Sequence, residues 1–230
     1  MSFKLAGIQK TTFIDYPEKI ACIVFTQGCN FRCGYCHNPE LFENKEPVLS
    51  VPAFFEFLNK RKGKLDGVVI TGGEPTLHNK DLIEFIKKVK SLGFLVKLDT
   101  NGTHPDVLQE LLNENLLDYI AMDIKAPLAK YKEITRVDID TDIIKKSIDM
   151  IMNCSVDYEF RTTIVKSQLS FEDLRQIGEL IQGAKRYYLQ KFLATKILDE
   201  NLMTETSYSD EEFKNLHTIL EEYVNFVDYR

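Results

Sequence analysis

Short hydrophobic segments alternate with longer amphipathic ones along most of the 230-residue chain. The short segments are rich in β-branched and aromatic residues, and they predict six strands, at Ile20–Phe25, Asp66–Ile70, Phe94–Leu98, Asp118–Ile124, Tyr158–Val165 and Tyr187–Phe192. The longer segments repeat their apolar residues at helical spacing, and they predict helices at Val51–Lys62, Asn79–Ser91, Pro105–Asn115, Asp142–Asn153, Phe171–Gln182 and Asp210–Val224. Before the first strand, Phe3–Asp15 predicts two short extended pieces.

Strands that alternate with helices are typical of α/β proteins with a parallel sheet and right-handed crossovers. A complete eight-fold barrel takes ~250 residues and eight strand–helix units. Six units therefore favour a partial (β/α)6 TIM-like barrel, with an open doubly wound sheet as the alternative. We expect one domain over residues 1–230, with an extended lead-in at 1–19, six βα units at 20–192, and a C-terminal loop and helix at 193–230.

Composition and charge exclude several classes of function. The formal net charge is −6, and the 29 Lys and Arg residues are mixed among 35 Asp and Glu, so nucleic-acid binding has no electrostatic support. No apolar run is long enough to span a membrane, and the first four residues lack the hydrophobic region of a signal peptide. We therefore expect a cytoplasmic protein whose thiols stay reduced.

Three of the five cysteines, Cys29, Cys33 and Cys36, lie directly after the first predicted strand with the spacing C-x3-C-x2-C. Neither a helix nor a strand period fits them, which indicates ligands. Structural zinc prefers four ligands in two separated pairs, and the C-x-x-C-H pattern of haem attachment requires an exported chain. Three thiolates on a [4Fe–4S] cluster would leave one iron open for chemistry, so this cluster is favoured over zinc and haem. We expect Cys22 and Cys154 to be buried core residues.

The cysteine spacing, with Tyr35 just before the last cysteine, resembles the radical S-adenosylmethionine (SAM) superfamily. This resemblance implies that Cys29, Cys33 and Cys36 are the catalytic cluster ligands and that the open iron chelates SAM. It further implies that reduction splits SAM into methionine and a 5′-deoxyadenosyl radical, which abstracts hydrogen from a substrate. The longer string from Asp15 to Leu41 is similar to the activating proteins of anaerobic ribonucleoside-triphosphate reductase, a branch of the glycyl-radical-enzyme activases.

Polar clusters follow the second and third predicted strands, and parallel α/β folds place their sites at such strand ends. The second strand leads into a Gly-Gly-Glu-Pro motif, and the resemblance assigns the backbone of Gly72, Gly73 and Glu74 to the amino group of SAM. The third leads into an Asp-Thr-Asn-Gly motif, and the resemblance places Asp99 and Asn101 at SAM, with Asp99 near its amino group. The alternative for both motifs is a simple turn.

The fourth and fifth predicted strands carry charged residues near their ends. Asp123 and Lys125 share one face of the fourth strand. The resemblance implies that Lys125 reaches the SAM carboxylate and that Asp123 faces the radical site, whereas the alternative is an ordinary surface ion pair. The resemblance also places Arg161 near SAM, and the alternative is a structural pair with Glu159. Tyr35 is expected to shield the cluster and to contact adenine.

The resemblance implies a radical SAM oxidoreductase that removes hydrogen from a glycine of a partner protein. The partner would be anaerobic ribonucleotide reductase or another glycyl radical protein, and flavodoxin or ferredoxin would donate the electron. One alternative is a radical SAM enzyme that acts on a small molecule or peptide. Another is a non-catalytic metal-binding interaction module, which would bind metal without affinity for SAM.

Overall fold

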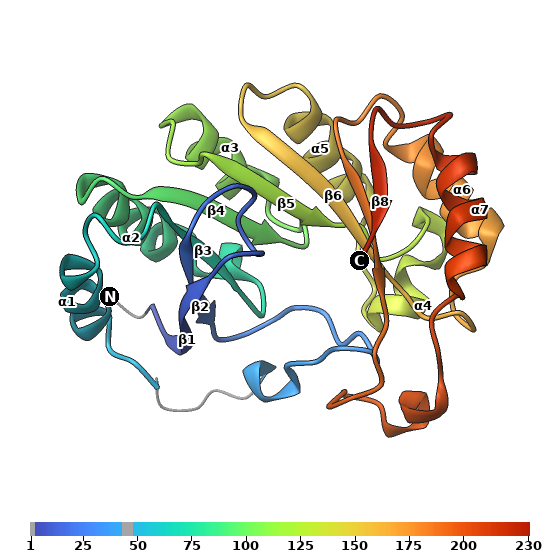
Figure 1. Ribbon diagram of the computed structural model, residues 1–230, viewed down its shortest axis with the longest axis horizontal. Helices are drawn as coiled ribbons and strands as arrows, with labels where there is room; N and C mark the ends of the chain where they lie inside the picture. The colour runs from blue at the N-terminus through green and yellow to red at the C-terminus, as the bar shows by residue number, and fades with distance from the viewer. Residues whose placement is uncertain (1–2, 43–47) are drawn as a thin grey trace. The chain divides into compact units, whose positions relative to one another are not determined.

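The computed structural model describes residues 3–42 and 48–230 (Figure 1). These residues group into two compact units, which we describe separately. The first unit comprises the described residues of Met1–Asn30, Glu40–Ile120 and Cys154–Asp157, and the second comprises Phe31–Pro39, Ala121–Asn153 and Tyr158–Arg230. The expected lead-in at 1–19 belongs to the first unit, and its residues 1–2 lie outside the described part. The single domain over residues 1–230 stays a prediction.

The strands follow one another in chain order in an open sheet, with β1 and β8 at its edges. In the first unit β1 (Leu5–Thr12) is antiparallel to β2 (Ala21–Thr26), and β2, β3 (Gly67–Gly72) and β4 (Leu95–Thr100) are parallel. The unit boundary falls within β5 (Tyr119–Asp123). In the second unit β6 (Asp157–Ile164, from its second residue), β7 (Tyr187–Lys191) and β8 (Val227–Tyr229) are parallel.

The alternation of strands and helices that the sequence predicts is confirmed. The six expected helices are α1 (Val51–Lys60), α2 (Asn79–Ser91), α3 (Pro105–Asn113), α5 (Thr141–Met152), α6 (Phe171–Leu180) and α7 (Asp210–Leu220). A capping box starts α6: the Ser170 hydroxyl accepts a hydrogen bond from Asp173 N, and the Asp173 carboxylate accepts one from Ser170 N. In Figure 1, α6 and α7 lie side by side in the second unit.

Several elements differ from the expectation. The lead-in forms one strand, β1, rather than two pieces. Two register shifts interrupt the alternation of its side chains, and for this reason its sequence resembles two short strands. The sequence also missed β8, which has three residues and is too short to show a period. Short helices that were not expected are α4 (Tyr131–Thr135) and the 3₁₀ segments η1 (Pro39–Phe42), η2 (Pro75–His78), η3 (Leu128–Lys130) and η4 (Glu200–Thr204).

A buried apolar cluster connects the strands of the first unit. Its buried members Ile23, Val69 and Tyr119 come from β2, β3 and β5, and Leu95 of β4 packs against them. Side chains on one face of a strand recur every second residue, so Lys97 and Asp99 lie on the same face of β4 as Leu95, farther toward its carboxyl end. The chain thus changes from apolar to charged as β4 approaches the predicted site.

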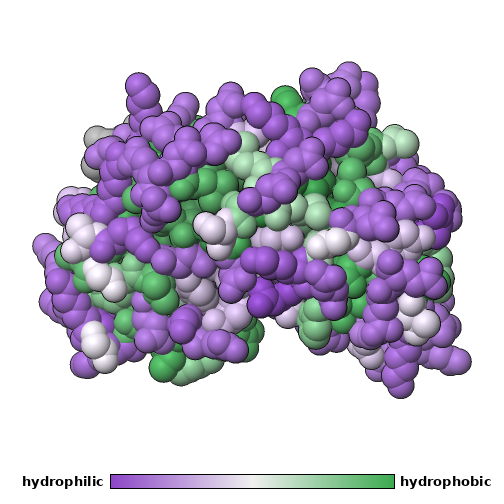
Figure 2. Space-filling view, turned by 90° about the horizontal axis from the view of Figure 1, so that it is seen from above, coloured by the Kyte–Doolittle hydropathy of each residue, from purple (hydrophilic) through white to green (hydrophobic). Residues whose placement is uncertain are grey.

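Some large hydrophobic side chains are exposed on the surface of the described part. Figure 2 shows hydrophobic patches between hydrophilic side chains on one face. Phe13 and Ile14, at the turn between β1 and β2, are among the exposed large hydrophobic residues. None of the helices formed by residues 3–42 and 48–230 combines the length and the apolar character that a membrane crossing requires.

Candidate active site

The first part of the cysteine loop is anchored within the first unit. Cys29 is half-buried, and the next residue, Asn30, holds it to the turn after β4. The Asn30 side chain accepts a hydrogen bond from Asn101 Nδ2 at 2.8 Å and donates one to Thr103 Oγ1 at 2.9 Å. Thr103 in turn donates its backbone N–H and its hydroxyl to Asn101 Oδ1, at 3.1 and 2.7 Å. These four bonds fix the residue beside Cys29.

The rest of the cysteine loop lies in the second unit. Cys36 N donates to Cys33 O at 3.0 Å, which closes a turn around the C-x-x-C segment. Burial raises the pKa of the Cys33 thiol, and the positive charge of Lys125 lowers it. Cys33 is buried and Cys36 is half-buried. All five cysteines lie within the described residues, and none of them forms a disulfide. Cys22 is buried as expected, whereas Cys154 is half-buried, so the expectation of a buried Cys154 was wrong.

Tyr35 belongs to this turn, and its side chain is buried. Its side chain is 5% exposed, and its hydroxyl has no hydrogen-bond partner of good geometry among the described residues, although it lies close enough to Cys33 to lower the pKa of that thiol. Burial raises the pKa of Tyr35 well above its usual range, and the nearby Cys33 raises it further. The expected shielding of the cluster by Tyr35 and its contact with adenine stay predictions.

Glu74 is the centre of a buried hydrogen-bond network in the first unit. Its side chain is 1% exposed. One carboxylate oxygen accepts from Thr76 N at 3.0 Å, from Thr76 Oγ1 at 2.5 Å and from Thr100 Oγ1 at 2.8 Å, and the other accepts from Asn101 N at 2.6 Å. The Glu74 side chain therefore joins the turn after β3 to the turn after β4. The Glu74 backbone is engaged as well, because Glu74 N donates to Gly28 O at 2.7 Å and Leu77 N donates to Glu74 O at 3.3 Å.

The two glycines before Glu74 are required by close approach of the backbone. A Cβ on Gly72 would lie 2.3 Å from Thr26 N, and one on Gly73 would lie 1.8 Å from Gly28 O. Gly72 also has φ of +129°, which side-chain-bearing residues rarely adopt. The motif thus lies directly against the segment that leads from β2 to the cysteines.

Asp99, the predicted contact of the SAM amino group, pairs with a lysine that we did not single out from the sequence. Lys97 Nζ lies 2.6 Å from Asp99 Oδ1, with the Lys97 side chain 2% exposed and that of Asp99 13% exposed. The Lys97 ammonium also lies 5.8 Å from the centre of the Tyr119 ring. The i, i+2 spacing on a strand was the available signal, because it places both charges on one face.

Asp123, Lys125 and Arg161 come together in the second unit. Arg161 Nε donates to Asp123 Oδ1 at 2.8 Å, and Lys125 Nζ donates to Asp123 Oδ2 at 3.1 Å. Burial raises the pKa of Asp123, but the charges of Arg161 and then Lys125 outweigh it and hold the pKa well below its usual range. Burial lowers the pKa of Lys125, and Asp123 reverses this and holds it well above its usual range. One carboxylate thus faces two cations, which leaves an excess positive charge suited to an anionic ligand.

Arg161 does not form its close ion pair with Glu159, which was the alternative from the sequence. Arg161 Nη1 lies 4.0 Å from Glu159 Oε1, whereas Arg161 Nε lies 2.8 Å from Asp123 Oδ1. Glu159 is 1% exposed and pairs instead with Arg230 at 2.8 Å. Arg230 was not expected from the sequence, because its partner lies 71 residues away.

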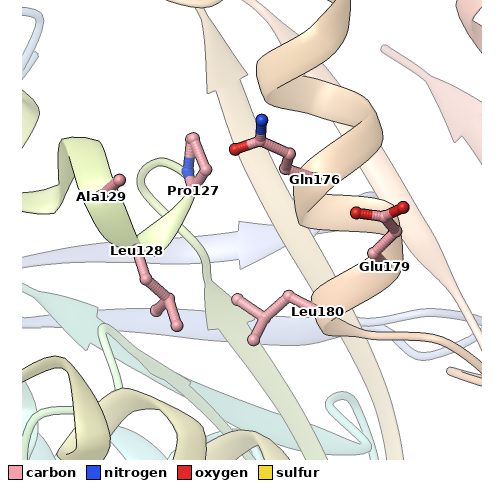
Figure 3. A pocket seen from close by; sticks show the side chains of 6 residues that line it. All are labelled: Pro127, Leu128, Ala129, Gln176, Glu179 and Leu180. Atoms are coloured by element: carbon pink, nitrogen blue, oxygen red, sulfur yellow. The ribbon is translucent and has the colours of Figure 1, made fainter.

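A shallow pocket elsewhere in the second unit involves none of the predicted site residues. Figure 3 shows its lining side chains, which come from the segment at η3 and from α6: Pro127, Leu128, Ala129, Gln176, Glu179 and Leu180.

The cysteines suit an iron–sulfur cluster by the chemistry of their donor atoms, because thiolates are the usual ligands of such clusters. Burial raises the pKa of the Cys33 thiol, and the positive charge of Lys125 offsets only part of this rise. Within the described residues, no three His, Cys, Asp or Glu side chains are gathered closely enough to hold a metal ion. The assignment of the three cysteines as cluster ligands therefore rests on their spacing in the sequence and on the chemistry of their thiolates.

Comparison with known sequences decides the family. The profile of the radical SAM superfamily matches residues 23–181, which include the cysteine loop and the clusters after β3 to β6. The chain belongs to the radical SAM superfamily. The cofactors of this superfamily, a [4Fe–4S] cluster and SAM, are accordingly those of this enzyme.

Two relatives of this radical SAM protein carry names of activating enzymes. It is 35% identical to a Methanocaldococcus jannaschii protein named provisionally as a glycyl-radical enzyme activating enzyme, over 100% of this chain and 97% of the relative. It is 33% identical to the pyruvate formate-lyase-activating enzyme of Clostridium pasteurianum, over 53% of this chain and 52% of the relative.

Solved structures confirm the partial-barrel fold. A domain of the pyruvate-formate lyase-activating enzyme from Bacteroides vulgatus aligns with a TM-score of 0.58 at 19% identity, covering 71% of this chain and 98% of that one. Streptococcus suis SuiB, solved with its precursor peptide SuiA, aligns with a TM-score of 0.68 at 15% identity, covering 90% of this chain and 48% of that one. At such identities the likeness concerns the fold.

Proposed function

We propose that this radical SAM protein is a glycyl-radical-enzyme activating enzyme, and that its partner is anaerobic ribonucleotide reductase. The observation that carries the proposal is the match over its whole length to the Methanocaldococcus jannaschii relative with that provisional name. The choice of partner rests on the similarity of the Asp15–Leu41 string to activating proteins of that reductase. Flavodoxin or ferredoxin would supply the electron, and the reaction would take place in the cytoplasm.

The proposed roles follow the placement of the side chains. The cluster would be held by Cys29, Cys33 and Cys36, and the SAM site would comprise Tyr35, Gly72, Gly73, Glu74, Asp99, Asn101, Asp123, Lys125 and Arg161. When bound, the cluster and SAM supply one-electron cleavage and hydrogen abstraction, and the protein supplies binding, orientation and exclusion of water.

The side chains of the second unit are suited to orient the carboxylate of SAM. Lys125 and Arg161 both bind Asp123, so they are held in place before the ligand arrives. Their two positive charges exceed the single charge of Asp123, which supports binding of one further carboxylate. In the first unit, Asp99 supplies a negative charge for an amino group, and Lys97 orients its carboxylate.

The first test is anaerobic reconstitution with iron and sulfide, followed by reduction with SAM and an assay for 5′-deoxyadenosine. We expect about four irons per chain and deoxyadenosine in the wild type and in C154S, and loss of both in C29S, C33S and C36S. One tightly bound zinc and no deoxyadenosine would leave the non-catalytic binding module.

The second test concerns the partner. The reconstituted enzyme is incubated with SAM, a reductant and either anaerobic ribonucleotide reductase or pyruvate formate-lyase, and the glycyl radical is measured by electron paramagnetic resonance (EPR). We expect the radical on the reductase. A radical on the lyase instead would change the partner, and deoxyadenosine with a radical on neither protein would favour a small-molecule or peptide substrate.

A further inference from the structure

Five charged side chains of the second unit form a continuous ladder of alternating sign. In order along the ladder they are Arg230, Glu159, Arg161, Asp123 and Lys125. The nitrogen–oxygen distances between successive members of the ladder are 2.8, 4.0, 2.8 and 3.1 Å. The third of these residues, Arg161, therefore has a carboxylate on each side, and the longer contact is the one to Glu159.

Arg230 reaches Glu159 by crossing the intervening strand. Its backbone N donates to Leu189 O of β7 at 3.0 Å, and Lys191 N donates to Arg230 O at 2.8 Å. Its guanidinium lies 4.3 Å from the centre of the Tyr188 ring, a cation–π distance. Tyr188 is the register partner of Arg161, so the guanidinium crosses on the face that carries Arg161 and Glu159.

Glu159 would otherwise compete for Arg161. It is 1% exposed, and a buried carboxylate requires a cation or a set of hydrogen bonds. Without Arg230, the nearest cation on this ladder is Arg161, at 4.0 Å. If Arg161 moved toward Glu159, the 2.8 Å hydrogen bond from Arg161 Nε to Asp123 Oδ1 would be lost. Asp123 would then pair with Lys125 alone among the cations of the ladder. The excess positive charge available to a ligand would then fall.

We propose that Arg230 is a positioning residue of the SAM site: it neutralises Glu159 and so leaves Arg161 on Asp123. The inference rests on the proposed function, because it takes Lys125 and Arg161 as the groups that receive the SAM carboxylate. It adds Arg230, the residue that follows β8, to the parts of the chain on which SAM binding depends.

The experiment uses the reconstituted holoenzyme and four variants: R230Q, E159Q, the double variant E159Q/R230Q, and R175Q as a matched control. Arg175 lies in the same unit, on α6, and pairs with Glu172 outside the ladder. SAM affinity is measured by equilibrium dialysis, and the EPR spectrum of the reduced cluster is recorded before and after SAM addition. The thermal unfolding midpoint is recorded for every variant.

We expect R230Q to weaken SAM binding by on the order of tenfold and to reduce the SAM-induced change in the spectrum. In E159Q the competing carboxylate is absent, so binding should weaken by no more than about twofold, and E159Q/R230Q should recover to within about threefold of the wild type. This pattern distinguishes positioning from a general loss of folding, because the double variant lacks both charges and yet binds better than R230Q.

Three outcomes would overturn the inference while the proposed function stands: R230Q binding SAM as R175Q does, E159Q losing as much affinity as R230Q, or the double variant binding no better than R230Q. Failure of the reconstituted wild type to bind SAM would instead overturn the proposed function, and with it this inference.

Discussion

The buried carboxylate of Glu74 accepts a 2.6 Å hydrogen bond from the backbone N–H of Asn101, and so connects the turns that follow two neighbouring strands, β3 and β4. Asn101 in turn binds Asn30, which is adjacent to Cys29. A residue of the Gly-Gly-Glu motif is thus linked through two side chains to the start of the cysteine loop. In this way a single glutamate can affect the position of Cys29 without contacting it.

We expect E74Q to reduce the free energy of unfolding by about 2 kcal/mol, because its amide NH₂ replaces one acceptor and leaves a buried donor unsatisfied. The measurement is urea unfolding of the protein without its cluster. E84Q is the matched control, since Glu84 is 57% exposed and lies on the outside of α2. Equal stability of E74Q and E84Q would show that the buried network contributes nothing.

G73A should reduce the free energy of unfolding by about 3 kcal/mol or more, because its Cβ would lie 1.8 Å from the backbone oxygen of Gly28. Backbone cannot move aside as the end of a flexible side chain can. In the control G7A the nearest atom is Phe25 Cδ2 at an ordinary 3.7 Å, so we expect a change within about 1 kcal/mol. The two urea transitions are compared at equal temperature, and coincident midpoints would contradict the expected collision.

The ion pairs of Asp123 predict a specific pH dependence. The pKa of Asp123 in the folded protein lies below its usual range because Arg161 and Lys125 outweigh burial, whereas an unfolded Asp titrates near pH ~3.9. Protonation therefore occurs first in the unfolded chain, and the contribution of Asp123 to stability is present above about pH 5 and is lost as the pH falls below it.

We expect the difference in unfolding free energy between wild type and D123N to shrink between about pH 5 and about pH 3. R161Q should show a weaker pH dependence than the wild type over this range, because the largest opposing charge is removed. The measurement is urea unfolding at several pH values. A wild-type-to-D123N difference that stays constant with pH would rule out a lowered pKa at Asp123.

The cysteines should differ in reactivity before the cluster is assembled. Burial raises the pKa of Cys22 to about 12 and also raises the pKa of Cys33, so both remain thiols at neutral pH. Iodoacetamide at about pH 8 should therefore modify Cys29, Cys36 and Cys154, which are half-buried, before Cys22 and Cys33. The sites are identified by mass spectrometry of digested protein.

Labelling in urea is the control, because unfolding should make all five cysteines react at similar rates. If the folded protein modified Cys22 as quickly as Cys154, the buried position of Cys22 in β2 would be wrong.

Local spacing predicted the cysteine motif, the six strand–helix units and the polar clusters at strand ends, because these features repeat over a few residues. The same reasoning placed Asp123 and Lys125 on one face of a strand, and the structure pairs them. It could not identify β8, whose three residues are too few to show alternation. The sequence therefore specified the family and the main candidate residues through short-range patterns.

The partners of those residues depended on the folded chain. Asn30 binds Asn101, and Glu159 binds Arg230, in each case across 71 positions. Residues so far apart meet because the sheet brings distant strands and the segments that follow them side by side, and no local period records which side chains face each other there. Whether a charge is buried, and which opposite charge satisfies it, follows from that packing, because desolvation arises only when the interior is assembled.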